Sequence, residues 1–291
     1  MTPHGYWKVE VITPDPFLIE ELSTYFFSHG SSGVEEILKR RSVRGIRAYI
    51  DTKIPKKKIR QSILQICGPR KAPLKIAAFR DKKWIDAWKK FLKPVYVGRK
   101  IFVRHDPKET LPKRFPKDGI ILDIKPTFAF GTGQHATTFL CLKEIIELAK
   151  DPSFSKLRIL DLGCGTAILA LAAHSLGGRN IRALDVDPMA ISASRENIET
   201  HGVKRGLTVQ LGSLTAREKP YDIIIANIML QTHLKLCKAY GESLKKDGKI
   251  ILSGLLVRQE DEMRACLRKN GFFVEQITKR RGWIRVDARK K

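Results

Sequence analysis

The sequence lacks any apolar run of the ~20 residues that a membrane-spanning helix needs. Its N-terminal residues also lack a basic segment followed by an apolar stretch, so we expect no secretory signal. The five cysteines are scattered and never spaced as CxxC, which argues against a zinc site and for reduced thiols. There is no internal repeat or low-complexity segment. These absences indicate a cytoplasmic globular protein without a metal site or membrane contact.

Positive charge is the unusual feature of the composition. The chain has 55 Lys and Arg against 30 Asp and Glu, a formal net charge of +25, and residues 1–117 hold 27 of the basic and 11 of the acidic side chains. A field of this sign attracts polyanions, of which nucleic acid is the obvious candidate. The alternative, that these side chains only solvate the surface, stays open because net charge concerns association rather than a site.

Residues 1–79 alternate between short strand and helix patterns. Their order, βαββαβ, predicts a ferredoxin-like α+β domain. The predicted strands are Trp7–Ile12, Val34–Leu38, Gly45–Asp51 and Leu74–Phe79, and the predicted helices run from Pro16 to Phe27 and from Pro55 to Cys67.

Residues 80–93 predict a linker helix. Trp84, Trp88 and Leu92 recur at a spacing of four, so one helical face carries two indole rings. We expect this face to pack on the following domain, and Pro94 to end the helix.

Residues 94–291 show the regular alternation of strands and helices that a parallel sheet requires. We therefore predict a doubly wound α/β domain. From Arg158 onward, five strands alternate with helices and two more strands follow, which is the layout of the seven-stranded, Rossmann-like sheet of methyltransferases. The predicted strands are Val95–Val103, Gly119–Ile124, Arg158–Leu162, Arg182–Val186, Thr208–Leu211, Ile223–Ala226, Lys249–Ser253, Phe272–Thr278 and Trp283–Val286, and two of the predicted helices are Leu140–Leu148 and Gln259–Lys269.

Two strand ends predict a nucleoside site. Asp161 ends an apolar strand, and Gly163 and Gly165 then allow a tight turn that approaches a ligand closely. A carboxylate ahead of the turn suits an amino-bearing ligand better than a phosphate. Asp185 ends the next strand, where it can accept hydrogen bonds from ribose hydroxyls, while Asp187 is the better cap for the following helix. On these two elements alone, an NAD enzyme remains an alternative.

Two further segments add polar groups. Asn227 ends another apolar strand and could hold the methionyl end of a cofactor, orient an amine or cap the next helix. In the loop AFGTGQHATT, Thr137 or Thr138 could cap a helix or bond the cofactor. His135 could be a general base, although a lone loop histidine more often serves as a hydrogen-bonding strut.

Several motifs together resemble the ribosomal protein L11 methyltransferase family (PrmA). They are YWKVEV, GSSGVEE, WIDAWKKFLKPVYVG, FGTGQHATT, DLGCGTAILALAA, DVDP, ANIML, ILSGLL and GWIRV, of which FGTGQHATT is the most specific. The resemblance implies S-adenosylmethionine as cofactor, bound at Thr138, Gly163, Asp185 and Asn227. It also implies methylation of lysine ε-amines and an N-terminal α-amine of a large-subunit ribosomal protein, gripped by the N-terminal domain. Ala167 stands where the family usually has glycine, which could narrow the space beside the cofactor.

The resulting hypothesis is a monomeric protein N-methyltransferase. We assign no catalytic acid or base, because desolvation in a closed pocket lowers the pKa of an amine without one. We expect at most weak contact with ribosomal RNA. An RNA methyltransferase and a non-catalytic RNA-binding module on the same fold are the alternatives.

Overall fold

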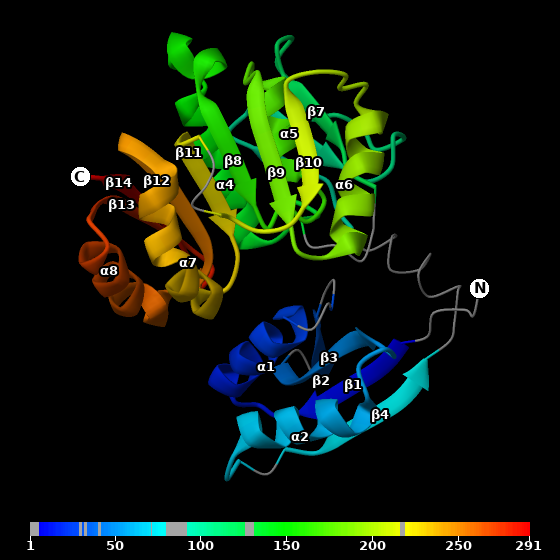
Figure 1. The fold of residues 1–291 in the computed structure, drawn as a ribbon. Helices are drawn as coiled ribbons and strands as arrows, with labels where there is room; N and C mark the ends of the chain where they lie inside the picture. Colours follow the sequence, from blue (N-terminus) through cyan, green and yellow to red (C-terminus); the bar gives the residue numbers. More distant parts are fainter. Residues whose placement is uncertain are drawn as a thin grey trace. The chain divides into compact units, whose positions relative to one another are not determined.

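The chain forms two compact units, Met1–Trp88 and Lys89–Lys291 (Figure 1). The structure is a computed structural model, and it describes residues 6–28, 31, 34–39, 42–70, 72–79, 92–125, 131–215 and 219–291. The predicted linker helix, 80–93, lies almost wholly outside the described residues. The first two residues of the AFGTGQHATT loop, 129–130, lie outside them too.

The described part of the first unit is a sheet of four strands with two helices. The strands are antiparallel and lie in the order β2-β3-β1-β4. The elements, in chain order, are β1 (Tyr6–Ile12), α1 (Pro16–Ser28), β2 (Val34–Lys39), β3 (Ser42–Asp51), α2 (Lys56–Cys67) and β4 (Leu74–Phe79). This is the predicted element order. The ferredoxin-like assignment rests on that order and stays a prediction.

Alternation along the strands builds the core of this unit. Val9 and Val11 of β1 and Ile46 of β3 are buried on one face of the sheet. Helix α2 places Ile59 and Ile63 on the same core at a spacing of four, which leaves its lysines on the opposite side.

The second unit begins with a small sheet of three strands, in the order β5-β6-β7. The strands are β5 (Val95–Val97), β6 (Ile101–Arg104) and β7 (Ile120–Asp123). The prediction of one strand over Val95–Val103 is wrong, because the chain turns back after Val97. Gly98 and Arg99 have φ of 57° and 53°, and Lys100 N donates to the carbonyl oxygen of Val97 at 3.0 Å, so these two left-handed residues form a tight turn before Ile101 pairs with Val97.

The seven described strands of the large sheet lie in the order β10-β9-β8-β11-β12-β14-β13. This confirms the predicted methyltransferase sheet. Its strands are β8 (Arg158–Leu162), β9 (Asn180–Asp185), β10 (Leu207–Leu211), β11 (Tyr221–Asn227), β12 (Leu244–Leu256), β13 (Phe272–Arg280) and β14 (Trp283–Lys290), and its helices are α4 (Ala136–Leu148), α5 (Ile168–Ser175), α6 (Pro188–Thr200), α7 (Leu230–Ser243) and α8 (Glu260–Lys269). None of the helices in the described ranges is long and apolar enough to cross a bilayer.

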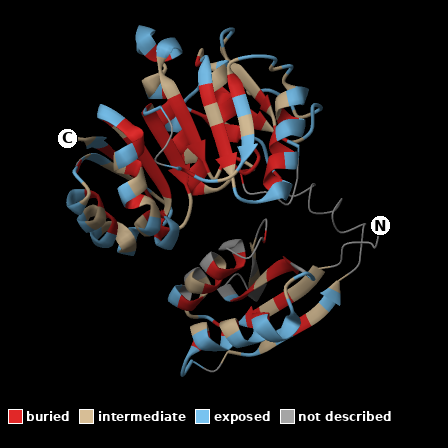
Figure 2. Cartoon of the chain, viewed as in Figure 1, coloured by how far each residue is buried: buried red, intermediate tan, exposed pale blue. Residues whose placement is uncertain are grey.

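Both faces of this sheet are covered, which explains its nearly continuous apolar strands. Ile159 and Ile225 belong to the core with α4 and α5, whereas Leu160 and Ile224 belong to the core with α7 and α8. Figure 2 shows the central strands β8 and β11 as almost entirely buried, whereas the edge strand β10 is largely exposed.

The chain order of the strands creates a topological switch point beside β8. After β8 the chain moves outward through β9 and β10, and then returns to the other side of β8 as β11. Ligands of open α/β sheets bind at such a switch point, outside the carboxyl ends of the strands. The candidate site is therefore expected beyond β8, β9 and β11.

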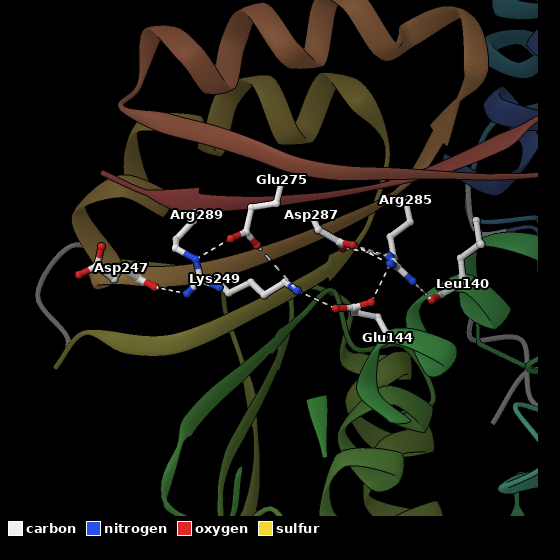
Figure 3. A network of polar contacts seen from close by, with 8 residues as sticks. All are labelled: Leu140, Glu144, Asp247, Lys249, Glu275, Arg285, Asp287 and Arg289. Atoms are coloured by element: carbon white, nitrogen blue, oxygen red, sulfur yellow. Dashed lines mark hydrogen bonds and ion pairs between the residues drawn. The ribbon is translucent and has the colours of Figure 1, made fainter. Parts of the chain in front are cut away.

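A buried ionic network ties α4 to β12 and β14 (Figure 3). Arg285, 3% exposed, contacts Asp287 at 2.6 Å and Glu144 of α4 at 2.7 Å, and donates to the carbonyl oxygen of Leu140 at 2.9 Å. Lys249 of β12 lies 2.6 Å from the other oxygen of Glu144. Every buried charge at this centre therefore has an opposite partner.

We expect Arg285→Met to lower the free energy of unfolding by about 3–5 kcal/mol, because it leaves the buried Asp287 carboxylate without its ion-pair partner and Glu144 with Lys249 alone. The control is Arg289→Met at the exposed end of the same network, where Arg289 is 44% exposed and pairs with Glu275. Its loss should stay below about 1 kcal/mol. Denaturant unfolding measures both, and equal losses would contradict the buried role of Arg285.

Candidate active site

The carboxyl edge of the large sheet gathers the four predicted site residues. Asp185 and Asn227 are the last residues of β9 and β11, and Gly163 directly follows β8. Thr138 lies in the first turn of α4, where its Oγ1 accepts a hydrogen bond of 3.3 Å from Asn227 Nδ2. Gly163 donates its N–H to the carbonyl oxygen of Leu184, one residue before Asp185, at 2.8 Å. The structure thus brings Thr138 to Asn227 and Gly163 to the end of β9.

The glycine-rich turn depends on positive φ angles. Gly163 has a φ of 71°, and a Cβ there would lie 2.4 Å from Cγ2 of Ile228, the residue after Asn227. Ala167, the N-cap residue of α5, has a φ of 63° and is fully buried. The consequence of alanine at this position is therefore backbone strain, of about 1–2 kcal/mol.

Asp185 organises the turn through both carboxylate oxygens. Oδ2 accepts from Gly165 N at 2.9 Å, and Oδ1 accepts from Asp187 N at 3.0 Å. Asp187 caps α6 by accepting from Met189 N at 2.8 Å, as predicted. A carboxylate accepts about four hydrogen bonds, so the half-buried Asp185 retains capacity for a ligand.

Asp161 is the buried acid of the site. It is 1% exposed, and its Oδ2 accepts from Ala170 N at 3.0 Å. Its Oδ1 has no hydrogen-bond partner in the described structure, and the same holds for Oδ1 of Asn227 on the neighbouring strand. Burial raises the pKa of Asp161 to about 7, against the lowering effect of the Ala170 hydrogen bond. Two unpartnered buried acceptors on adjacent strands suit a ligand that donates hydrogen bonds, such as an ammonium group.

Asp161 is absent from the four predicted binding residues, although the sequence contained its signal. A carboxylate between an apolar strand and a glycine-rich turn is expected to face the ligand. Among the described residues, no group of three or more His, Cys, Asp or Glu side chains could hold a metal ion.

His135, not a threonine, caps α4. Its Nδ1 accepts from Thr137 N at 3.4 Å and lies 2.7 Å from Thr137 Oγ1. The helix therefore begins at Ala136, four residues earlier than predicted. The His135 ring lies edge-on to Trp283, with centroids 4.6 Å apart. Burial lowers the pKa of His135 to about 4, so it stays neutral near pH 7 and is a structural strut.

The FGTG loop contacts the glycine-rich turn directly. Thr166, fully buried, donates its Oγ1 hydrogen to the carbonyl oxygen of Gly131 at 2.7 Å. A Cβ on Gly131 would lie 2.6 Å from that hydroxyl, and the φ of Gly131 is 111°. Glycine is therefore required at this contact.

We expect Asp161→Asn to change how stability depends on pH. Between pH 3.8 and about 7 the folded protein holds a proton on Asp161 that the unfolded chain does not bind. The free energy of unfolding of the native protein therefore loses up to about 1.4 kcal/mol per pH unit, as pH rises, from this group. The variant lacks this loss. The free energy of unfolding of the variant minus that of the native protein should therefore increase as pH rises from 3.8 to about 7, and stay constant above that pH.

Denaturant unfolding of both proteins from pH 4 to 8 measures this difference. Burial also lowers the pKa of His135 and His233 to about 4, which makes stability rise with pH from about 4 to 6.5. Both histidines are present in both proteins, so their effect cancels in the difference. A difference that stays constant from pH 4 to 7 would contradict the raised pKa of Asp161.

A family model described as ribosomal protein L11 methyltransferase (PrmA) matches residues 19–291. A ribosomal protein L11 methyltransferase of Desulfitobacterium hafniense is 35% identical over 72% of this chain, which spans 65% of that relative's length. One from Dictyoglomus turgidum is 31% identical over 88% of this chain and 84% of its own.

A solved structure agrees with these relatives. The ribosomal protein L11 methylase from Lactobacillus delbrueckii subsp. bulgaricus is 29% identical with a TM-score of 0.62, over 69% of this chain and 100% of that one. The family model covers almost the whole chain and includes the glycine-rich turn and the strand ends described above. The chain belongs to the ribosomal protein L11 methyltransferase (PrmA) family.

Proposed function

We propose that the protein transfers methyl groups from S-adenosylmethionine to a large-subunit ribosomal protein in the cytoplasm. The acceptors are lysine ε-amines and the N-terminal α-amine. Family membership supports the reaction class, the methyl donor and the substrate. The observation that carries the proposal is the pair of unpartnered buried acceptors, Oδ1 of Asp161 and Oδ1 of Asn227, at the switch point of the sheet.

The residues at this edge fit the cofactor. Thr138, Gly163, Asp185 and Asn227 would hold it, Asp185 through the ribose hydroxyls and Gly163 through the tight turn that its positive φ allows. Asp161, together with Asn227, would accept hydrogen bonds from the methionyl ammonium.

Apolar surface beside Asp185 would suit the adenine ring. Val186, Met189 and Leu211 are 72%, 46% and 58% exposed, which is unusual for residues of these types. An aromatic base lying on them would remove this surface from water.

The chain's own residues then position an amine. When bound, the cofactor supplies an electrophilic methyl group on its sulfonium. An acceptor amine would have to lose its proton to water before its nitrogen could accept that methyl group, and the sulfonium sulfur would keep the electron pair of the broken S–C bond. A lysine has a pKa of about 10.4, which desolvation lowers. Asn227 can orient the amine, and no described group acts as a dedicated base.

The first unit is proposed to hold the protein substrate. All four cofactor-binding candidates lie in the Lys89–Lys291 unit, whereas residues 6–79 have their own sheet and core. This separation supports a substrate-recognition domain over residues 1–79.

We expect the protein to transfer label from S-adenosylmethionine to purified ribosomal protein L11 and not to deproteinised ribosomal RNA. Asp185→Ala should weaken cofactor binding by about 10- to 100-fold, since hydrogen bonds to a charged group are worth about 1.5–3 kcal/mol. The control is Asp187→Ala, which loses the cap of α6 and should keep affinity within a few-fold.

Calorimetric titration measures the cofactor affinity of each variant, and a filter assay measures the label transferred to ribosomal protein and to RNA. Label in RNA would instead establish the RNA methyltransferase. An unchanged affinity in Asp185→Ala would remove the ribose assignment.

We further propose a weak, sequence-independent contact between α2 and ribosomal RNA. Lys57, Lys58 and Arg60 are exposed near the N-terminus of α2, and within the described structure none of them forms an ion pair. Positive side chains at a helix N-terminus oppose the helix dipole. A polyanion would relieve that repulsion.

Replacing Lys57, Lys58 and Arg60 by alanine should reduce the slope of log affinity for RNA against log salt by about 2–3. The control replaces Lys113, Arg114 and Lys117, an exposed set of the same charge in the other unit. Fluorescence anisotropy over a salt series measures both. A larger change of this slope in the control than in the α2 variant would overturn the assignment to α2.

A further inference from the structure

One buried amide joins the glycine-rich turn to the chain on both sides of residues 126–130. Asn197 of α6 is fully buried, and its Oδ1 accepts from Lys125 N at 3.0 Å. Its Nδ2 donates to the carbonyl oxygen of Thr166 at 3.0 Å, and Thr166 in turn donates to the carbonyl oxygen of Gly131 at 2.7 Å. We call this chain of contacts, from Lys125 through Asn197 and Thr166 to Gly131, the Asn197 bridge.

The bridge uses chemistry that no apolar side chain supplies. Lys125 N needs an acceptor and the Thr166 carbonyl needs a donor, and one amide supplies both in fixed geometry. Both Asn197 and Thr166 are 0% exposed, so losing either contact would leave a buried polar group unsatisfied.

Docking of α6 does not account for the amide. The helix already buries Ala190, Ile191 and Ala193, and Ser194 Oγ donates to the carbonyl oxygen of Gly165 at 2.7 Å, so α6 is attached to the turn without Asn197. Asparagine is also a poor residue for a helix interior. Its presence in α6 is therefore explained by the two backbone groups that it joins.

We propose that Asn197 is a positioning residue for methyl transfer. The bridge sets the distance between the glycine-rich turn, which contains Gly163, and the loop from Gly131 that leads into α4 and Thr138. These are two sides of the cofactor site, and Asn197 itself reaches no reacting group. The inference rests on the proposed function for its effect on activity, whereas the bridge itself is testable without it.

Three variants separate positioning from stability. Asn197→Asp keeps the acceptor for Lys125 but places a second oxygen against the Thr166 carbonyl. Thr166→Val removes only the donor to Gly131 and keeps the shape of the side chain. Glu196→Gln is the matched control, because Glu196 also links α6 to Lys125, through an exposed ion pair of 2.9 Å to Lys125 Nζ.

The measurements are made well below each variant's melting temperature. We expect Asn197→Asp to raise the Kd for S-adenosylmethionine at least fivefold and lower kcat at least tenfold, with KM for the ribosomal protein changed less than twofold. Thr166→Val should show the same pattern more weakly, and Glu196→Gln should match the native protein. Amide hydrogen exchange at residues 131–134 should accelerate at least tenfold in Asn197→Asp and in Thr166→Val only.

The outcomes are distinguishable. If the native protein binds no cofactor but exchange at 131–134 still depends on Asn197, the bridge stands and the proposed function fails. If folded Asn197→Asp and Thr166→Val keep native Kd, kcat and exchange while only their melting temperatures fall, Asn197 is merely structural and the inference is overturned. If Asn197→Asp does not fold, Thr166→Val alone decides, and native values for it overturn the inference.

Discussion

The buried guanidinium of Arg285 fixes where α4 lies, and the candidate site depends on that helix. Its ion pair with Glu144 and its hydrogen bond to Leu140 hold α4 against β14 within two residues of Thr138. Thr138 in turn accepts the hydrogen bond from Asn227. The contacts of β14 therefore fix α4, and α4 places Thr138 beside the end of β11. Packing far from the candidate site thus determines where Thr138 and Asn227 lie.

The sequence predicted the large sheet well because apolar runs and glycine punctuation record which segments are buried and where they end. The predicted bounds of strands and helices were wrong where a polar contact or a turn determines where the element begins or ends. The hairpin at Gly98 and Arg99 needs two positive φ angles, and arginine gives no sign of one. The early start of α4 depends on His135 acting as a cap, which histidine seldom does.

Which of the candidate residues lie near one another could likewise be predicted in part. Strand order alone places Asp185 and Asn227 at one edge, since the carboxyl ends of parallel strands meet there. Which polar atoms remain unpartnered depends on three-dimensional packing, so the lone Oδ1 of Asp161 could not be predicted. Asn197 was missed for a related reason: its two partners are backbone groups, which the sequence does not distinguish from any others.

The position of β14 also orders events during synthesis. It is the last strand of the sheet to leave the ribosome, yet it lies between β12 and β13 and contacts Leu140, 145 residues earlier in the chain. Closing so long a loop is slow compared with forming local helices. Until β14 inserts, Glu144 lacks its arginine and keeps only Lys249 of β12 as a partner. A nascent chain should therefore form the glycine-rich turn well before the contacts that place Thr138 beside Asn227 are complete, which ties completion of the candidate site to completion of the domain.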